Sequence, residues 1–502
     1  MGGRSWLIAV ALGLVSIGCQ SGAQRAPASD TPQNVPTTAK SWQAPTTEAS
    51  TTGPAIPDAA VVVEPGDDLA LLAREHPDGT IFFLRSGVHR IDTVVPRPNQ
   101  SFLGEAGAVV SGARVVRDFE PRGDRWVARQ SPAGIEERGK CEDDRPCTLA
   151  EELFLDGQPL RRVNSASEVK AGTWYFDLEK EEVLLSVDPT GLLVEMSYVT
   201  TAFDRGSTGV TIRGLVIEKF ASPGQFGAIM PDKEWTIEGN EIRFNHAIGI
   251  KVASGNLVRD NYIHHNGQFG LGGGGTGSVI EGNEIAGNNT AGFSPFWGAG
   301  GTKFVHTQDL VVRNNLVYGN GGPGLWTDGR NERVLYEGNT VMDNAFSGIK
   351  HELAGSAIIR DNVVLRNGFD HPVPLRGAGI LVRESSGVEI VGNLLEGNVD
   401  ALILFHDADR KNEIGVQLEN VIVQGNIFVL GDGLVGYKGD LPGDPILEGN
   451  LIFEGNTYVV PEGHRQFLDN GNRFDFRGWV ESGRELGAHR VDSLEEAEAL
   501  AK

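Results

Sequence analysis

Four side chains able to act on a substrate recur at one place in successive repeats of the sequence. Asp328, Glu352, Arg383 and His406 each stand at the same distance after a repeated asparagine, once an insertion before Arg383 is allowed for. If each repeat contributes a strand to one stack, neighbouring side chains lie about 5 Å apart. Two carboxylates at that distance can act as acid and nucleophile in glycoside hydrolysis. The pattern therefore predicts a catalytic pair, Asp328 and Glu352, with Arg383 beside it.

Other side chains near this column are candidates for binding a substrate. Two residues before Asp328 and Glu352 stand Trp326 and Lys350, on the same expected strand face. We expect Trp326 to stack on a sugar ring, and an inserted loop to supply Trp297 and Lys303. His406 is expected to end the column. Insertions at 294–307, 368–378 and 407–419 would wall a groove.

The same residues allow other interpretations. In a uronate lyase, Lys350 would be the base and Arg383 would neutralise the uronate carboxylate. Acidic neighbours are expected to raise the pKa of Lys350, which argues against this. The carboxylates could instead hold Ca²⁺, and the sequence indicates no other cofactor. Finally, the charges could be a paired ladder on a non-catalytic glycan-binding or structural protein, with a flat or filled face.

The elements that position these residues are repeats marked by asparagines. The commonest intervals between the asparagines are 21 to 24 residues, and a second asparagine often follows five residues later. Apolar residues hold fixed places around them, which indicates short strands joined by turns. The period is too short for a β-α-β unit, so stacked coils in a parallel β-solenoid are expected, with the asparagines bonding buried turns. The first series is Asn240, Asn261, Asn283, Asn315, Asn339, Asn362, Asn393, Asn426 and Asn450.

The pattern predicts an all-β chain with short helical caps. The repeats occupy 210–462, and 58–209 is an N-terminal cap and opening region that includes a helix from Asp67 to His76. Residues 463–502 form a C-terminal cap. On the candidate strand, His351 is expected to face inward as a buried, hydrogen-bonded histidine. His264 and His265 are expected at the surface of a turn.

The N-terminus predicts export and a lipid anchor. An apolar run ends at Cys19, so 1–18 is interpreted as a lipoprotein signal peptide, cleaved before a lipidated Cys19. The alternative is an ordinary secretory signal. Residues 19–57 are rich in Ser, Thr and Pro and are expected to be a disordered tether. The protein is then attached to the outer membrane or cell surface, and Cys141 and Cys147 can form a disulfide there.

Composition limits the partners. The chain has 502 residues, a formal net charge of −23 and a pI near 4.9. Such a charge repels nucleic acid phosphates, and an anionic substrate would need a local basic patch. Nothing in the sequence predicts an oligomer, so a monomer is expected.

The body of the chain resembles secreted bacterial right-handed parallel β-helix repeat proteins of the pectate-lyase-like superfamily. The resemblance rests on LFLDGQPLRRV from Leu153, GTWYFDL from Gly172, NGQFGLGG from Asn266, GGTKF from Gly300, GLWTDGRN from Gly324 and GIKHE from Gly348. It implies a β-helix that binds polysaccharide. It does not imply one reaction, because this fold hosts lyases, hydrolases, epimerases and adhesins. The group has an acidic residue where this sequence has Gly298.

Overall fold

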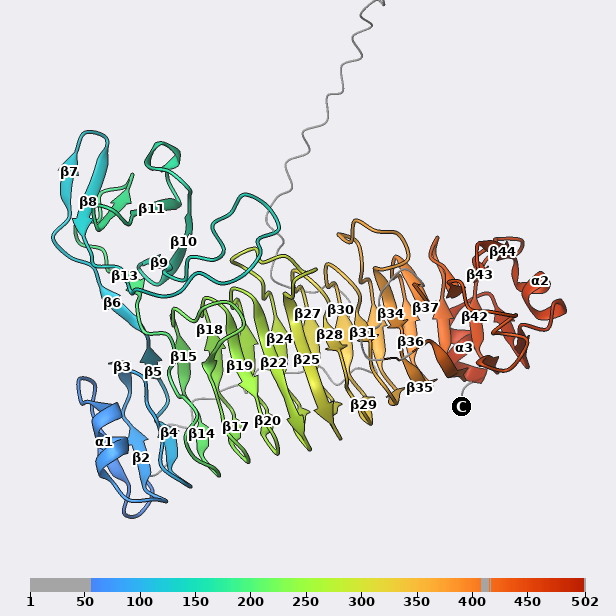
Figure 1. Ribbon diagram of the computed structural model, residues 1–502, viewed down its shortest axis with the longest axis horizontal. Coiled ribbons are helices and arrows are strands. Elements are labelled where there is room, and N and C mark those ends of the chain that lie inside the picture. The colour runs from blue at the N-terminus through green and yellow to red at the C-terminus, as the bar shows by residue number, and fades with distance from the viewer. Residues whose placement is uncertain (1–55, 408–414, 416, 501–502) are drawn as a thin grey trace, which may run out of the picture. The chain divides into compact units, whose positions relative to one another are not determined.

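The protein is described by a computed structural model, which covers residues 56–407, 415 and 417–500. The expected signal peptide, Cys19 and nearly all of the tether lie outside the described residues. Within them, three sheets run along a stack of coils, and from Thr211 to Asp469 each coil adds one parallel strand to each sheet (Figure 1). This is the expected right-handed parallel β-helix.

The first sheet, called sheet A, lies on one side of the stack, and consecutive coils supply neighbouring strands. Its strands, in order, are β1 (Val61–Val63), β2 (Ile81–Leu84), β4 (Ser101–Gly104), β14 (Thr211–Arg213), β17 (Thr236–Glu238), β20 (Leu257–Arg259), β23 (Val279–Glu281), β26 (Val311–Arg313), β29 (Val334–Glu337), β32 (Ala357–Arg360), β35 (Ser386–Val391), β38 (Glu419–Gln424), β41 (Leu451–Glu454) and β45 (Glu485–Leu486).

Sheet B follows sheet A in each coil after a short turn. Its strands are β3 (Gly87–Arg90), β5 (Ala108–Ser111), β15 (Val216–Glu218), β18 (Glu241–Arg243), β21 (Tyr262–His264), β24 (Glu284–Ala286), β27 (Leu316–Tyr318), β30 (Thr340–Met342), β33 (Val363–Leu365), β36 (Leu394–Glu396), β39 (Ile427–Val429), β42 (Thr457–Val459) and β46 (His489–Val491).

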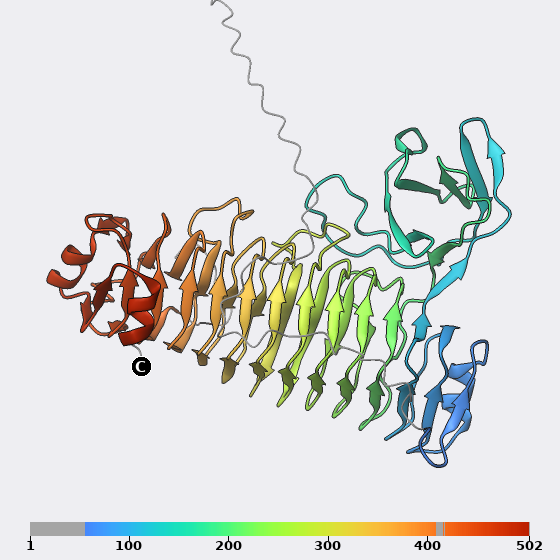
Figure 2. The same ribbon diagram turned by 180° about the vertical axis from the view of Figure 1, so that it is seen from behind.

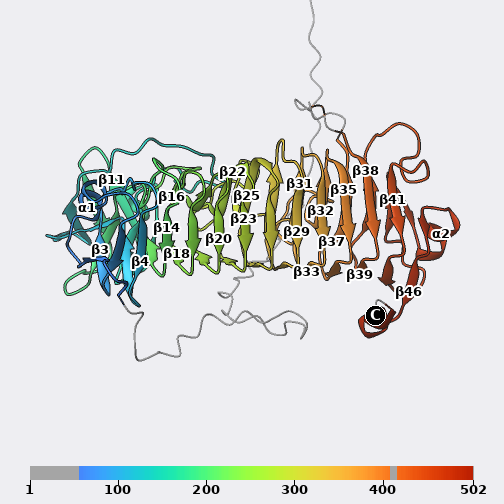
Figure 3. The same cartoon turned by 90° about the horizontal axis from the view of Figure 1, so that it is seen from below.

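Sheet C completes the coil and carries the candidate column. Its strands are β16 (Gly227–Ile229), β19 (Ile248–Val252), β22 (Phe269–Thr276), β25 (Gly300–Gln308), β28 (Leu325–Asp328), β31 (Ile349–Glu352), β34 (Ala378–Arg383), β37 (Asp400–Phe405), β40 (Val435–Lys438), β43 (Phe467–Asp469) and β44 (Asn472–Phe474), the last antiparallel to β43. The strands of successive coils lie side by side in Figure 3.

The core fills the inside of the coils, because alternate residues of each short strand point inward. The expected apolar columns are confirmed: for example, Ile237, Val258 and Ile280 pair along sheet A and are fully buried. Helix α1 (Leu69–Glu75) starts at Asp68, whose carboxylate accepts from the Leu71 amide, as the sequence predicts. At the other end lie α2 (Phe476–Glu481) and α3 (Leu494–Leu500).

The asparagines form two continuous ladders inside the turns. In the first, the Asn283 amide donates to Asn315 Oδ1, and Asn315 donates to Asn339 Oδ1, each at 3.0 Å. Each amide also donates to a backbone carbonyl, as Asn315 does to Ile280 at 2.9 Å. Buried carbonyls and amides of the turns are thereby satisfied from coil to coil.

The prediction is wrong for the last member of the first ladder. Asn426 donates to Asn456, not to Asn450, and Asn456 donates to Glu485. Asn450 is exposed at the end of a long loop. The tripeptide Glu-Gly-Asn occurs twice there, and only the second copy follows a sheet A strand, β41.

The opening region differs from the expected cap. Parallel strands already begin at Val61, well before residue 210, and β4 and β5 pair directly with β14 and β15. The sequence repeat is hidden because residues 113–197, here called the inserted module, interrupt the coils. Figure 2 shows the module beside the first coils.

The inserted module is mostly antiparallel, and its first and last strands pair with each other. The strands are β6 (Ala113–Val115), β7 (Glu120–Arg122), β8 (Arg125–Arg129), β9 (Leu153–Leu155), β10 (Gln158–Arg162), β11 (Thr173–Asp177), β12 (Glu182–Leu185) and β13 (Val194–Ser197), with a 3₁₀ turn at Ala166–Glu168. Cys141 and Cys147 are joined by a disulfide in this module.

Candidate functional site

The candidate column is assembled by the register of sheet C. Asp328 on β28 pairs with Glu352 on β31, and Glu352 pairs with Arg383 on β34. The intervening residues Thr327 and His351 point inward and are fully buried. Alternation along the strands therefore places both carboxylates on the outer face, about 5 Å apart by the spacing of paired strands.

Each carboxylate is held by cations from the same sheet. The Lys303 ammonium lies 2.8 Å from Asp328 Oδ2. The Glu352 carboxylate accepts from Lys350 at 2.5 Å and from Arg383 at 2.9 Å. Glu352 has a side-chain exposure of only 3%, whereas Asp328 keeps 21%. These charged hydrogen bonds fix both side chains in place.

Trp326 does not lie as expected. Its side chain is only 3% exposed, so it offers no open ring face to a sugar. The Lys303 and Lys350 ammonium groups, from the coils on either side, lie 3.8 and 4.2 Å from its ring centroid. Trp326 therefore positions two lysines by cation–π contact. Trp297 also lies elsewhere than expected: it packs on Phe293 beside the disulfide.

A pocket of about 140 Å³ opens over the carboxylates. Asp328, Lys350, Glu352 and Arg383 form its floor and sides. Such a volume is small beside the roughly 300 Å³ at which pockets for drug-sized ligands begin. The outer face of sheet C is therefore hollowed here, and neither flat nor filled.

The mouth of the pocket is aromatic. Phe296 is 56% exposed and lies 5.6 Å from Phe346 and 5.7 Å from His371, measured between ring centroids. Burial lowers the pKa of His371 to about 4, so its ring is neutral at pH 7. These rings supply the apolar surface that was expected of Trp326 and Trp297.

The expected insertions contribute to this pocket unequally. Residues 294–299 bring Pro295 and Phe296, and 368–378 brings His371 and Arg376. From residue 300 onward, however, the first insertion is strand β25. Lys303 therefore belongs to the sheet itself, beside Trp326, since the next residue, Phe304, pairs with Thr327.

His406 lies outside the column. Arg383 pairs with Phe405, so the register of β37 is one residue earlier than expected and His406 follows the strand. The next residue, Asp407, reaches the site instead: its carboxylate accepts from Arg383 at 2.8 Å and from Arg376 at 3.0 Å. Asp407, the first residue of the third insertion, thereby holds the Arg376 and Arg383 side chains in place.

The expectation for the pKa of Lys350 is wrong in sign. Burial lowers it below the ordinary lysine value, and the nearby Glu352 and Asp328 only partly offset this. The loss of water around the charged ammonium outweighs the attraction of the two carboxylates, and the sequence alone does not show this burial. The pKa of Lys350 therefore no longer argues against this residue as the base of a lyase.

His351, directly beneath the site, is buried and hydrogen-bonded as predicted. Its Nδ1 lies 2.7 Å from Thr327 Oγ1, which accepts from the Tyr336 hydroxyl at 2.9 Å. Its Nε2 lies 3.0 Å from the Gly355 carbonyl, which can only accept. Nε2 therefore donates, Nδ1 accepts, and the ring is neutral. Burial lowers the pKa of His351 to about 4.

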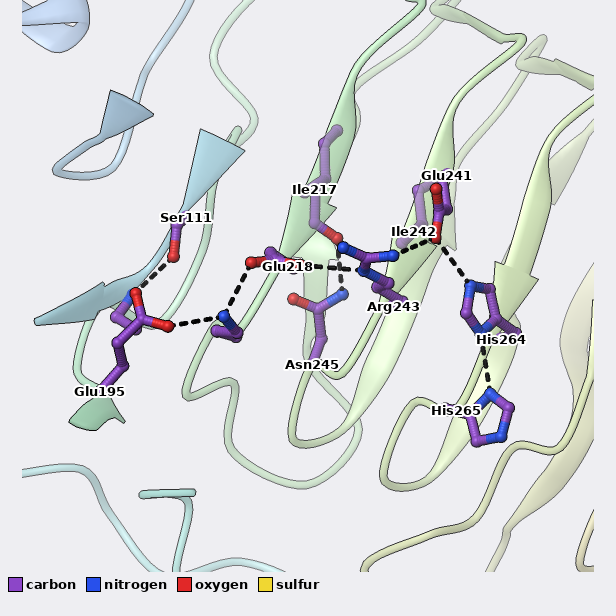
Figure 4. A network of polar contacts seen from close by, with 12 residues as sticks. Ser111, Glu195, Ile217, Glu218, Glu241, Ile242, Arg243, Asn245, His264 and His265 are labelled. Carbon is purple, nitrogen blue, oxygen red and sulfur yellow. Dashed lines mark hydrogen bonds and ion pairs between the residues drawn. The ribbon is translucent and has the colours of Figure 1, made fainter. Parts of the chain in front are cut away.

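His264 is buried, contrary to the prediction, and only His265 is exposed. Figure 4 shows His264 in a chain of polar contacts on sheet B: its Nε2 lies 3.2 Å from Glu241, which pairs with Arg243, and its Nδ1 lies 2.7 Å from Nδ1 of His265. Arg243 pairs in turn with Glu218, and Lys219 joins Glu218 to Glu195 of the inserted module. The prediction placed His264 in a turn, whereas strand β21 continues through it.

Sequence reasoning missed Phe346, His371 and Arg376, which line the pocket, and Asp407, which holds Arg376 and Arg383. They lie in turns and insertions, where the repeat gives no register. Their only signal is their place in or beside long insertions between coils, which often carry function.

Among the residues that the structure describes, no group of three or more His, Cys, Asp or Glu is placed to hold a metal ion. No helix in the described ranges is long and apolar enough to cross a membrane.

Comparison with known proteins agrees with this fold. Residues 227–395 match the family model described as right handed beta helix region. Mannuronan C5-epimerase AlgE5 of Azotobacter vinelandii is 28% identical over 154 residues, which cover 28% of this chain and 14% of that protein. AlgE3 of the same organism is 31% identical over 138 residues, or 26% of this chain and 7% of that protein. The match thus spans a small part of these relatives.

Solved structures are similar over more of the chain. A complex of XylC with xylose gives a TM-score of 0.61 at 15% identity, covering 81% of this chain and 83% of that one. The A-module of mannuronan C-5 epimerase AlgE6 from Azotobacter vinelandii gives 0.51 at 16% identity, covering 84% and 93%. These similarities show the fold: the chain is a right-handed parallel β-helix.

Proposed function

We propose that the protein is a carbohydrate-active enzyme that hydrolyses a glycosidic bond with Asp328 and Glu352. The observation that carries this proposal is that the two carboxylates are register partners on neighbouring strands and line one pocket. Their expected separation of about 5 Å matches the distance typical of retaining glycosidases. The relatives named above act on mannuronan or bind xylose, which supports a sugar substrate.

The shape of the pocket favours a terminal sugar. A volume of about 140 Å³ accommodates about one sugar ring, and the aromatic mouth formed by Phe296 and Phe346 suits the apolar face of that ring. A charged floor provides hydrogen bonds to hydroxyl groups. We therefore expect removal of single sugars from chain ends in preference to internal cleavage.

The test is a screen of the purified protein against 4-nitrophenyl glycosides and polysaccharides. Asp328→Asn and Glu352→Gln should each reduce turnover by about 10²-fold to 10⁴-fold. Glu337→Gln is the matched control: Glu337 also pairs with an arginine of the next coil, Arg360, but lies on sheet A away from the pocket. Retention of anomeric configuration, followed by NMR, is expected, and azide rescue distinguishes the acid–base residue from the nucleophile. Activity unchanged in both variants would refute the proposal.

A second candidate is β-elimination or epimerisation at a uronate. The lowered pKa of Lys350 suits a base, and Arg376 and Arg383 in the same pocket could bind a carboxylate. Unsaturated uronate product, detected by absorbance, would favour this reaction. Binding of a polysaccharide without any product would favour the non-catalytic alternative.

We also propose that the chain is exported and anchored through Cys19. Cys19→Ala should then move the protein from the membrane fraction to the soluble fraction and abolish labelling by a radioactive fatty acid. Unchanged labelling would contradict the anchor at this residue.

A further inference from the structure

A second pocket, of about 280 Å³, lies where the inserted module meets the coils. From the module it is lined by β9, β10 and the segment around the disulfide, and from the coils by the turns that follow β18, β21 and β24. It shares no lining residue with the pocket over Asp328 and Glu352. It is therefore a separate cavity on sheet B.

Both walls of this pocket are held in place. The Lys219 ammonium on the solenoid lies 2.7 Å from Glu195 of the module. His246 on a solenoid turn bonds Glu152 of the module at 2.7 Å and the Cys147 carbonyl at 3.0 Å. A site between two elements fixed in this way is preformed, which lowers the entropic cost of binding.

The body of the pocket is apolar and aromatic. Phe154 of the module and Phe244 of the solenoid lie 6.1 Å apart between ring centroids, and His265 lies 6.0 Å from Phe244. Leu160 and Leu149 complete the apolar lining. A flat apolar group is therefore the part of a ligand that would fill it.

The polar groups at this pocket are mainly cationic donors. Arg145, Arg161 and Arg162 line it, and the one acid among its lining residues, Glu152, is already bonded to His246. Arg145 is already paired with Asp143, and Arg162 with Glu151, so the guanidinium donors without a partner among the described residues include those of Arg161 and Nη2 of Arg162. A ligand at this pocket must therefore supply hydrogen-bond acceptors.

Two of these arginines have unused capacity. Arg161 is exposed and makes no ion pair with any residue that the structure describes. Arg162 has a side-chain exposure of 6%; its Nη1 bonds Glu151, while its Nη2 has no partner among the described residues. A buried guanidinium with an unsatisfied nitrogen is costly unless an anion lies near it.

We propose that this pocket is a binding site for a small carboxylate with an aromatic body. The ring would lie among Phe154, Phe244 and Leu160, the carboxylate would accept from the unpartnered Nη2 of the buried Arg162, and the exposed Arg161 would contribute its charge from the rim. Arginine binds carboxylates through paired N–H groups, which gives such a site preference for a planar anion. The site is independent of the reaction proposed at Asp328 and Glu352.

The test measures binding to the full-length protein by calorimetry, with 3-phenylpropionate as the probe and 3-phenylpropanamide as its neutral counterpart. The carboxylate is expected to bind at least about tenfold more tightly than the amide. Arg161→Gln should weaken binding of the carboxylate about tenfold and leave the amide unchanged. Arg74→Gln, at another exposed arginine without an ion pair among the described residues, is the matched control and should change neither.

A second variant tests the cavity itself. Thr290→Trp, at an exposed position in the lining, should fill the pocket and abolish binding of both probes while the protein stays folded. Equal affinity for acid and amide, no effect of Arg161→Gln, or binding that survives Thr290→Trp would each overturn the proposal. So would the absence of binding to the unaltered protein.

Discussion

Acidification should destabilise the protein through His351. Its pKa is about 4 in the folded chain and about 6.5 when unfolded. Above pH 6.5 both states are neutral and the fold loses nothing. As the pH falls through 6.5, His351 is protonated in the unfolded chain but not in the folded chain. The free energy of unfolding therefore decreases until about pH 4.

The size of this loss follows from the two pKa values. Their difference corresponds to roughly 3.4 kcal/mol below pH 4, and to about 2 kcal/mol at pH 5. Raised carboxyl pKa values, such as that of the buried Glu485, act in the opposite direction over part of this range. The contribution of His351 must therefore be isolated by comparison with a variant.

His351→Gln is the appropriate variant, because its amide can still donate toward the Gly355 carbonyl but does not titrate. The free energy of unfolding in urea would be measured for both proteins at pH 7.5 and pH 5. The unaltered protein should lose about 2 kcal/mol more than the variant between these values. Parallel losses in the two proteins would show that His351 titrates normally, and would refute the assignment of a neutral, buried ring.

Further predictions test the packing around the site and the ladders. Arg383→Met should lower the free energy of unfolding by about 2 kcal/mol, because it removes a charged hydrogen bond from the buried Glu352 carboxylate. Arg360→Met, at an exposed ion pair, should lower it by less than about 1 kcal/mol, and equal costs would contradict the burial of Glu352. Asn315→Leu should lower the free energy of unfolding, measured in urea, by about 3 kcal/mol, because it leaves polar backbone groups of the turn without hydrogen bonds. Asn450→Leu should lower it by less than about 0.5 kcal/mol. A large cost at Asn450 would show that this residue does belong to the ladder. Trp326→Leu should cost about 2 kcal/mol if the indole is core packing, and a change near zero would indicate an exposed ring.

Much of the fold could be predicted because each stacked coil repeats the same spacing of asparagines and apolar residues, and this spacing fixes the strand register. Wherever an asparagine and its flanking apolar residues recur, as at Asn315 and Asn339, strand, face and partner follow from one another. Prediction failed where spacing was ambiguous. The two Glu-Gly-Asn tripeptides at Asn450 and Asn456 are locally equivalent, and only the pairing of β41 distinguishes them.

The candidate site was predictable only as far as the register. Asp328, Glu352 and Arg383 were brought together because they occupy equivalent positions on regular strands. Exposure was not predictable: Trp326 is enclosed by two lysines whose side chains reach across from neighbouring coils. The aromatic mouth could not be predicted either, since it joins loops of different coils.

The inserted module changes the order in which the coils can assemble. Strand β5 ends at Ser111 and its partner β15 begins at Val216, so about 100 residues separate two neighbouring strands. Closing so long a loop costs roughly 3 kcal/mol more than closing a four-residue turn. The pairing of β6 with β13 brings Ala113 beside Ser197 and leaves about 20 residues to close, which is the length of one coil. The later coils can therefore grow from their own local contacts, while the first coils join only after the module has folded.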